Sequence, residues 1–116
     1  GHMLLAADYD KSNLLDIDDV TKVKTGGADI AAINKALKDW DCSDTGVMYC
    51  TSGLFDGLRD AAKDGEHGLS AGLAKLAAKG RAHVVAVTGC WWQDIDTTES
   101  RILAERYLSE RLRRIG

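Results

Sequence analysis

Two aspartates, Asp94 and Asp96, lie two positions apart in the segment from Trp91 to Ser100. In extended backbone, side chains at this spacing project to the same side, with Cα atoms about 6.5 to 7 Å apart. Two carboxylates placed in this way can bind one Mg²⁺ ion, with phosphate oxygens completing its coordination. Without a cation, their charges repel by roughly 0.6 to 2.5 kcal/mol. The spacing makes this pair a candidate metal site.

A second interpretation of the same segment needs no metal. The residues Asp96, Thr97, Thr98 and Glu99 match a helix capping box, with Asp96 as the N-cap and Glu99 at the third helical position. A cap contributes about 1 kcal/mol, which is enough to account for Asp96. It accounts neither for Asp94 nor for the two tryptophans before it. The residue types alone leave the two interpretations at even odds.

The first half of the chain offers further groups for a phosphate ester and its hydroxyls. Its candidate cations are Lys22, Lys24, Lys35 and Lys38. The tripeptide Asp44–Gly46 precedes an apolar run and offers a carboxylate together with close backbone approach to a ligand. Solvated strand edges and an ordinary turn are the commoner explanations for both features.

Hydrophobic periodicity predicts strands and helices that position these groups. Glycines at 26 and 27 predict a hairpin turn, and residues 34–45 are predicted to form a loop or a short helical turn. Strands are expected at 4–8, 20–25, 28–33, 46–51 and 82–89, and helices at 53–63, 70–79 and 97–114. This order indicates an α/β fold, a mixed β-sheet with covering helices.

Several expectations concern caps and burial. Ser52 and Ser70 are expected to cap the first two helices. The first helix places Leu54, Phe55, Leu58 and Ala62 at helical spacing, and the last is expected to bury Ile102, Leu103, Tyr107, Leu108 and Leu112.

Composition bounds the class of protein. The 116 residues suffice for one domain, expected over residues 4–116, with 1–3 interpreted as an expression remnant in which Met3 is also a candidate native start. A net charge of -3 argues against a general nucleic-acid binder. No apolar stretch is long enough to span a membrane. The three cysteines lack CxxC spacing, so buried thiols in a reducing, cytoplasmic compartment are expected.

Three segments, taken in order, resemble the C-terminal half of the sugar-phosphate nucleotidyltransferases, which have a Rossmann-like fold. They are most similar to the inositol-1-phosphate cytidylyltransferase-like branch. The segments are DIDDVTKVKTGGADIAAINKAL, SDTGVMYCTSGLFDGL and VTGCWWQDIDTTESRILAERYL. The resemblance implies attack by a phosphate monoester on the α-phosphorus of a nucleoside triphosphate, with release of pyrophosphate and with Mg²⁺ as cofactor.

The resemblance also implies roles for particular residues. Asp96 is expected to be a metal carboxylate with Asp94 as its neighbour, and Lys35 is expected to contact the acceptor phosphate. Contacts with the polyol or sugar are expected from Asp44, Thr45 and Gly46, with Lys22 close to the site.

The chain also departs from the family pattern. The 116 residues contain neither the GxGxR triphosphate loop nor the lysine and first metal aspartate that follow it, and Thr98 replaces the usual proline. We therefore expect a truncated transferase segment, inactive alone. Its expected partners are a sugar- or polyol-phosphate, a nucleotide, and either a second copy in a homodimer or a missing N-terminal half. The alternatives are a non-enzymatic binding or self-association module and, less favoured, a metal-dependent hydrolase that uses Asp94 and Asp96.

Overall fold

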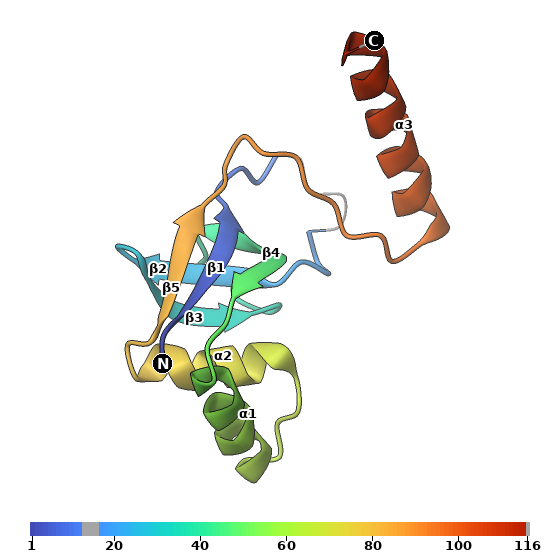
Figure 1. Ribbon diagram of the computed structural model, residues 1–116. Helices are drawn as coiled ribbons and strands as arrows, with labels where there is room; N and C mark the ends of the chain where they lie inside the picture. Colours follow the sequence, from blue (N-terminus) through green and yellow to red (C-terminus); the bar gives the residue numbers. More distant parts are fainter. Residues whose placement is uncertain (13–16, 116) are drawn as a thin grey trace.

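The computed structural model describes residues 1–12 and 17–115 (Figure 1). Its elements are β1 (Met3–Asp8), β2 (Lys22–Gly26), β3 (Asp29–Asn34), β4 (Cys42–Tyr49), α1 (Gly53–Lys63), α2 (Leu69–Ala78), β5 (Ala82–Ala86) and α3 (Thr98–Ile115). The order of strands and helices is the one predicted, and the α/β class with a mixed sheet is confirmed.

The sheet closes on itself in the strand order β1-β4-β2-β3-β5. Strand β1 runs parallel to β5, whereas the other neighbouring pairs are antiparallel. The predicted hairpin joins β2 to β3, with Gly27 at a φ of 62°, where a side chain would be strained. A single residue pair, Asp29 with His83, joins β3 to β5 and closes the ring.

The core lies between the inner face of the sheet and α2. Its largest fully buried side chains include Met3, Leu5 and Val23 from the strands and Leu73 and Leu76 from α2. Helix α2 packs against β3 and β5, and α1 packs on α2. Figure 1 shows both helices on the same side of the sheet.

Helices α1 and α2 approach each other closely through glycines. A Cβ atom on Gly57 would lie 2.6 Å from the carbonyl oxygen of Gly72, and one on Gly72 would lie 2.5 Å from Leu58 Cδ2. Accordingly, the buried residues of α1 are Gly53, Gly57 and Ala61, while Phe55 is 59% exposed. The spacing of the larger apolar residues thus predicted where the helix lies in the sequence, but it did not predict which side of the helix is buried.

The predicted ends of two strands were wrong. Residues 42–45 belong to β4 and not to a loop, because they pair with β1 on one side and partly with β2 on the other. Strand β5 ends at Ala86 instead of residue 89. Val85 is exposed because side chains alternate along the strand, and Ala82 and Val84 occupy the face toward the core.

Three local predictions also fail. Ser52 makes no side-chain capping hydrogen bond because its backbone is already helical, and α2 begins at Leu69, so Ser70 lies inside the helix. Of the cysteines, Cys42 is buried as expected, whereas Cys50 and Cys90 are exposed.

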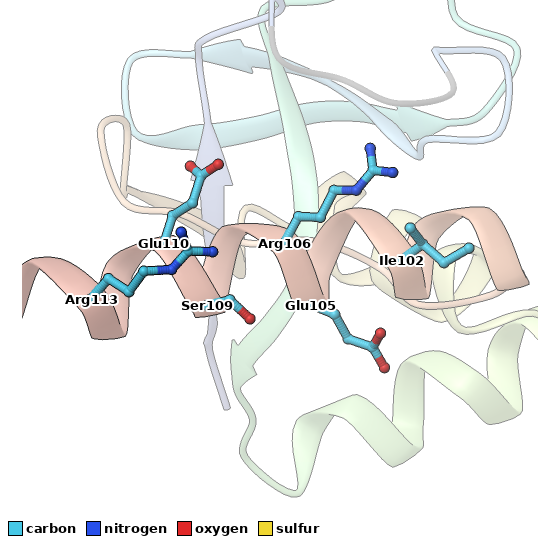
Figure 2. A pocket seen from close by; sticks show the side chains of 6 residues that line it. All are labelled: Ile102, Glu105, Arg106, Ser109, Glu110 and Arg113. Carbon is cyan, nitrogen blue, oxygen red and sulfur yellow. The ribbon is translucent and has the colours of Figure 1, made fainter.

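Helix α3 stands apart from the sheet (Figure 1). The prediction of a buried stripe along it was wrong, because Ser100 and Ala104 are its buried residues and Leu112 is 68% exposed. A hollow of about 350 Å³ along the helix is lined only by α3 side chains, which Figure 2 shows projecting from the single helix. This hollow is therefore a surface groove of one element. No helix in the described ranges is long and apolar enough to cross a bilayer.

Candidate functional site

The strand directions gather the predicted site residues at one rim of the closed sheet. Because β1 and β5 are parallel, their carboxyl ends meet there. Strand β4 is antiparallel to β1, so its first residues lie at the same rim, with Ser43 opposite both Asp8 and Lys22. Lys22 also pairs with Asn34, which places Lys35 next to it. In α/β proteins, ligands bind beyond the carboxyl ends of parallel strands.

A cavity of about 860 Å³ opens beside this rim. Of the predicted site residues, Asp94 and Asp96 line it. Its wall is acidic and aromatic, and the residues of these two kinds are Asp8, Asp10, Asp19, Asp94, Asp96, Glu99, Trp91, Trp92 and Tyr107. A cavity with this lining attracts cations more readily than free anions.

Asp94 interacts electrostatically with several of the other predicted site residues. Partial burial, followed by the charges of Asp96 and Asp19, raises the pKa of the Asp94 carboxyl, and Lys35 opposes this rise. The Lys35 Nζ lies 3.2 Å from Asp19 Oδ1. Burial also raises the pKa of Asp44, a hydrogen bond from the Gly46 N–H lowers it, and Asp94 raises it further. Asp96, Lys35 and Asp44 thus each interact electrostatically with Asp94.

Asp96 does not cap α3 with its side chain, so the capping interpretation of this residue was wrong. Ser100 N–H donates to Thr97 Oγ1 at 3.1 Å, and Thr97 N–H donates to Ser100 Oγ at 3.0 Å. These reciprocal bonds form a capping box with Thr97 as the N-cap, one residue later than predicted. Of Asp96, only the backbone N–H takes part, donating to Ser100 Oγ at 3.1 Å.

The two carboxylates suit a divalent cation that is shared with a ligand. Asp94 and Asp96 are both exposed and line the same cavity. Among the residues that the structure describes, no cluster of three or more potential metal ligands occurs, so the chain forms no closed metal cage there. Mg²⁺ is commonly held by one or two carboxylates together with phosphate oxygens and water. The donor set therefore fits a Mg²⁺ ion whose coordination a phosphate ligand completes.

Lys22 is a structural cation in this arrangement. It is 7% exposed, and its Nζ donates to the carbonyl oxygens of Lys35 at 2.7 Å and Val20 at 3.3 Å. These bonds tie the start of β2 to the segment that follows β3. Lys22 therefore fixes the backbone at Lys35, whose own side chain is exposed.

The tripeptide Asp44–Gly46 lies in the middle of β4. Thr45 Oγ1 donates to the carbonyl oxygen of Ala6 at 2.8 Å, and the Gly46 N–H donates to Asp44 Oδ1 at 2.7 Å. Gly46 has a φ of 83°, a conformation that favours glycine. Thr45 thus braces β4 against β1, while half-buried Asp44 keeps acceptor capacity for a ligand hydroxyl.

Sequence reasoning missed Asp8 and Asp19 as residues of this site. Asp8 is 7% exposed; its Oδ1 accepts the Asp10 N–H at 2.9 Å and its Oδ2 accepts the Trp92 Nε1–H at 2.7 Å. The sequence feature that could have identified Asp8 is its position as the carboxylate at the end of an apolar strand.

The neighbouring tryptophan has a partner on α3. Trp91 stacks on Tyr107 with ring centroids 4.3 Å apart.

Three curated proteins are similar to this chain, each described as a bifunctional IPC transferase and DIPP synthase. The protein of Thermococcus kodakarensis is 31% identical over 96 residues, covering 81% of this chain and 21% of the relative. That of Archaeoglobus fulgidus is 33% identical over 94 residues, covering 81% and 18%. That of Aquifex aeolicus is 30% identical over 91 residues, covering 78% and 21%. The chain thus spans about a fifth of the length of these relatives.

The fold is also that of a solved structure. The inositol-1-phosphate CTP transferase from T. maritima superposes with a TM-score of 0.74 and 23% identity, covering 85% of this chain and 40% of the other. No family model matches the chain. Sequence and fold thus point to the same group of proteins.

Proposed function

We propose that this chain, which is related over most of its length to part of the inositol-1-phosphate cytidylyltransferase-like enzymes, forms the acceptor side of a nucleotidyltransferase. Its acceptor would be a sugar- or polyol-phosphate. The observation that supports the proposal is that Asp94 and Asp96 line the same cavity as Asp19, whose carboxylate lies 3.2 Å from Lys35 Nζ. Asp44 pairs with Ala7 near the end of β1, so the groups come from three separate parts of the chain.

Each group has a distinct task in the proposed site. The Lys35 ammonium, paired with Asp19 in this structure, binds the phosphate of the acceptor. The Asp44 carboxylate accepts hydrogen bonds from acceptor hydroxyls. Asp94 and Asp96 would hold Mg²⁺, which when bound neutralises charge on phosphate oxygens. The chain itself then contributes mainly position, by fixing the acceptor phosphate relative to these carboxylates.

Turnover requires a nucleotide-binding half. The GxGxR motif expected for the triphosphate does not occur in the 116 residues. We propose that the segment binds acceptor and cation alone but transfers a nucleotidyl group only together with that half. A homodimer of this chain is a separate prediction. Sedimentation at several concentrations tests it, because a dimer should become more abundant as the concentration rises.

An amide NMR titration with inositol 1-phosphate tests the acceptor site, and separate titrations with Mg²⁺ and with CTP test the other ligands. Shifts are expected near residues 34–36, 44–46 and 94–96. The variant Lys35→Met should weaken binding of inositol 1-phosphate about tenfold or more, since it removes a charge-assisted contact. Lys63→Met is the matched control, because Lys63 is an exposed lysine at the end of α1 and does not line the acidic cavity. An absence of shifts at millimolar ligand would contradict the proposal and favour a non-enzymatic module.

A further inference from the structure

We infer that Trp40 is a positioning residue: its indole ring holds the buried ammonium of Lys22, and Lys22 in turn fixes the backbone that carries Lys35. The part that Lys35 plays in binding the acceptor phosphate rests on the proposed function. The contacts between Trp40 and the lysines belong to the fold and stand apart from that function.

Trp40 is half-buried and lies in a segment that is bonded to β2. The Asp41 N–H donates to the carbonyl oxygen of Val23 at 2.8 Å. Asp41 Oδ2 accepts the Thr25 N–H at 2.8 Å and the Thr25 hydroxyl at 3.1 Å. These three bonds hold the backbone next to Trp40 against the sheet, so the indole ring is a fixed support for groups that lie on it.

The ammonium of Lys22 is buried and needs compensation for its charge. The residue is 7% exposed, and its Nζ donates to the carbonyl oxygens of Lys35 at 2.7 Å and Val20 at 3.3 Å. None of the ion pairs among the described residues includes Lys22. An ammonium has three donors, and a buried charge is costly when it is left incompletely paired. Lys22 Nζ lies over the Trp40 ring at 5.7 Å from the centroid, and an indole face attracts a cation at this range.

A second lysine lies on the same tryptophan. Lys11 Nζ is 4.0 Å from the ring centroid and donates to the Trp40 carbonyl oxygen at 2.7 Å. Because Lys11 is exposed, solvent weakens this contact, and the buried Lys22 is expected to depend more on the ring. Lys11 follows β1, between Asp10 and Ser12, which both line the acidic cavity. Trp40 therefore connects the loop after β1 with the segment after β3.

The bond from Lys22 reaches the chain where it leaves the sheet. Strand β3 ends at Asn34, so the Lys35 carbonyl is the first one beyond the strand, and Lys22 Nζ holds it. The next N–H, that of Ala36, donates to Asn34 Oδ1 at 2.8 Å, which is a contact within the same turn. The Lys35 side chain is exposed, so the position of its backbone decides which volume its ammonium reaches.

The side-chain NMR signals of Lys22 test the contact directly. Protons above an indole ring are shifted upfield by the ring current, and comparison with Lys22→Met assigns the Cε protons of this lysine. We expect an upfield shift in the wild type that disappears in Trp40→Leu. Trp40→Phe has a smaller ring current and should leave an intermediate shift. Trp92→Phe is the aromatic control and should leave the Lys22 signals in place, because Trp92 lines the acidic cavity.

Binding of inositol 1-phosphate tests the consequence for Lys35. Trp40→Leu should weaken this binding about fivefold, because Lys22 loses the attraction of the ring. Trp40→Phe should restore most of the affinity, since a phenyl face also attracts a cation. Lys22→Met should weaken binding at least as much as Trp40→Leu. The double variant should be no weaker than Lys22→Met alone, because the ring acts through Lys22.

Mn²⁺ binding, followed by water proton relaxation, distinguishes positioning from a general loss of structure. Asp94 and Asp96 lie on a different segment from Trp40, so Trp40→Leu should bind Mn²⁺ as the wild type does. Amide exchange gives a second comparison. It should become about fivefold faster at residues 35–36 in Trp40→Leu and stay unchanged within α1 and α2, because only the local support is lost.

The outcomes separate this inference from the proposed function. Wild-type protein that shows the Lys22 shift but binds no inositol 1-phosphate would contradict the proposed function, and Trp40 would then be judged by amide exchange at residues 35–36. Ordinary Lys22 signals in the wild type would overturn the inference. So would a Trp40→Leu variant that binds a wild-type ligand with unchanged affinity. If Trp40→Leu does not fold, Trp40→Phe decides, through a reduced Lys22 shift and binding about twofold weaker than that of the wild type.

Discussion

Thr97 and Ser100 close the start of α3 by exchanging hydrogen bonds between the backbone N–H of each and the hydroxyl of the other. We predict that Ser100→Ala weakens the first turn of α3 by about 1 kcal/mol. Amide exchange at residues 101–104 measures this change. Asp96→Asn should leave that exchange unaltered and weaken Mn²⁺ binding instead. The reverse result, with exchange altered only in Asp96→Asn, would restore Asp96 as the cap.

The raised pKa of Asp94 predicts a pH-dependent stability. The folded state binds a proton more tightly than the unfolded state, so the free energy of unfolding falls as pH rises from the ordinary aspartate range through the raised pKa. Asp94→Asn removes this effect. The variant should therefore melt above the wild type at neutral pH, and the difference should vanish below the ordinary aspartate range. Melting curves between about pH 3 and 8 measure it.

Two control experiments accompany the prediction for Asp94. Glu110→Gln changes an exposed carboxylate of α3 outside the acidic cavity and should leave Mn²⁺ binding unchanged. Saturating Mn²⁺ should stabilise the wild type relative to Asp94→Asn, because a cation reverses the repulsion between the carboxylates. A variant that melts below the wild type at neutral pH without metal would contradict the assigned sign.

Strand β4 offers a pair of hydroxyls with opposite predicted effects. Ser43 Oγ is buried without a hydrogen-bond partner among the described residues, whereas Thr45 Oγ1 donates to Ala6. Ser43→Ala should stabilise the fold by about 1 kcal/mol, because an unpaired hydroxyl no longer has to be desolvated. Thr45→Val should destabilise it by about 1 to 2 kcal/mol. Urea unfolding measures both, and destabilisation by Ser43→Ala would indicate a buried water bound to Ser43.

Gly57 of α1 lies where α1 and α2 approach each other closely, so a larger residue there should destabilise the fold. By helix propensity alone, Gly57→Ala would stabilise α1 by about 1 kcal/mol. The new Cβ would instead meet the Gly72 carbonyl oxygen, so we predict net destabilisation of about 2 kcal/mol in urea unfolding. Gly26→Ala, where a Cβ meets nothing within 4 Å, should change stability by less than about 0.5 kcal/mol. A stabilised Gly57→Ala variant would show that the helices can separate.

Local chemistry made part of the fold predictable. The glycines at 26 and 27 predicted the hairpin; Gly26 is the last residue of β2, and Gly27, at positive φ, lies in the turn itself. The three ordered segments predicted the family resemblance, which the comparisons confirm. The metal, the acceptor and the residue roles stay predictions. Asp94 and Asp96 were candidates because carboxylates two positions apart in extended backbone project to the same side and can bind one cation.

Other features depend on contacts that a local pattern does not contain. The segment after Ile95 holds two overlapping capping boxes, and the path of the backbone selected the one that starts at Thr97. The apolar stripe of α3 predicted a buried face, yet periodicity does not say what covers it. The bond between Asp8 and Trp92 joins residues 84 positions apart, and it depends on the parallel pairing of β1 with β5.

The ring of strands has a consequence for how the segment behaves among other polypeptides. Exposed strand edges recruit further strands and so promote aggregation. Here β3 and β5 meet at Asp29 and His83, and α2 packs against both strands. The β1 side of β5 is paired along the whole strand, whereas beyond His83 its other side has no β3 partner among the described residues. Addition of a foreign strand is therefore hindered where the ring closes and is easier along the second half of β5.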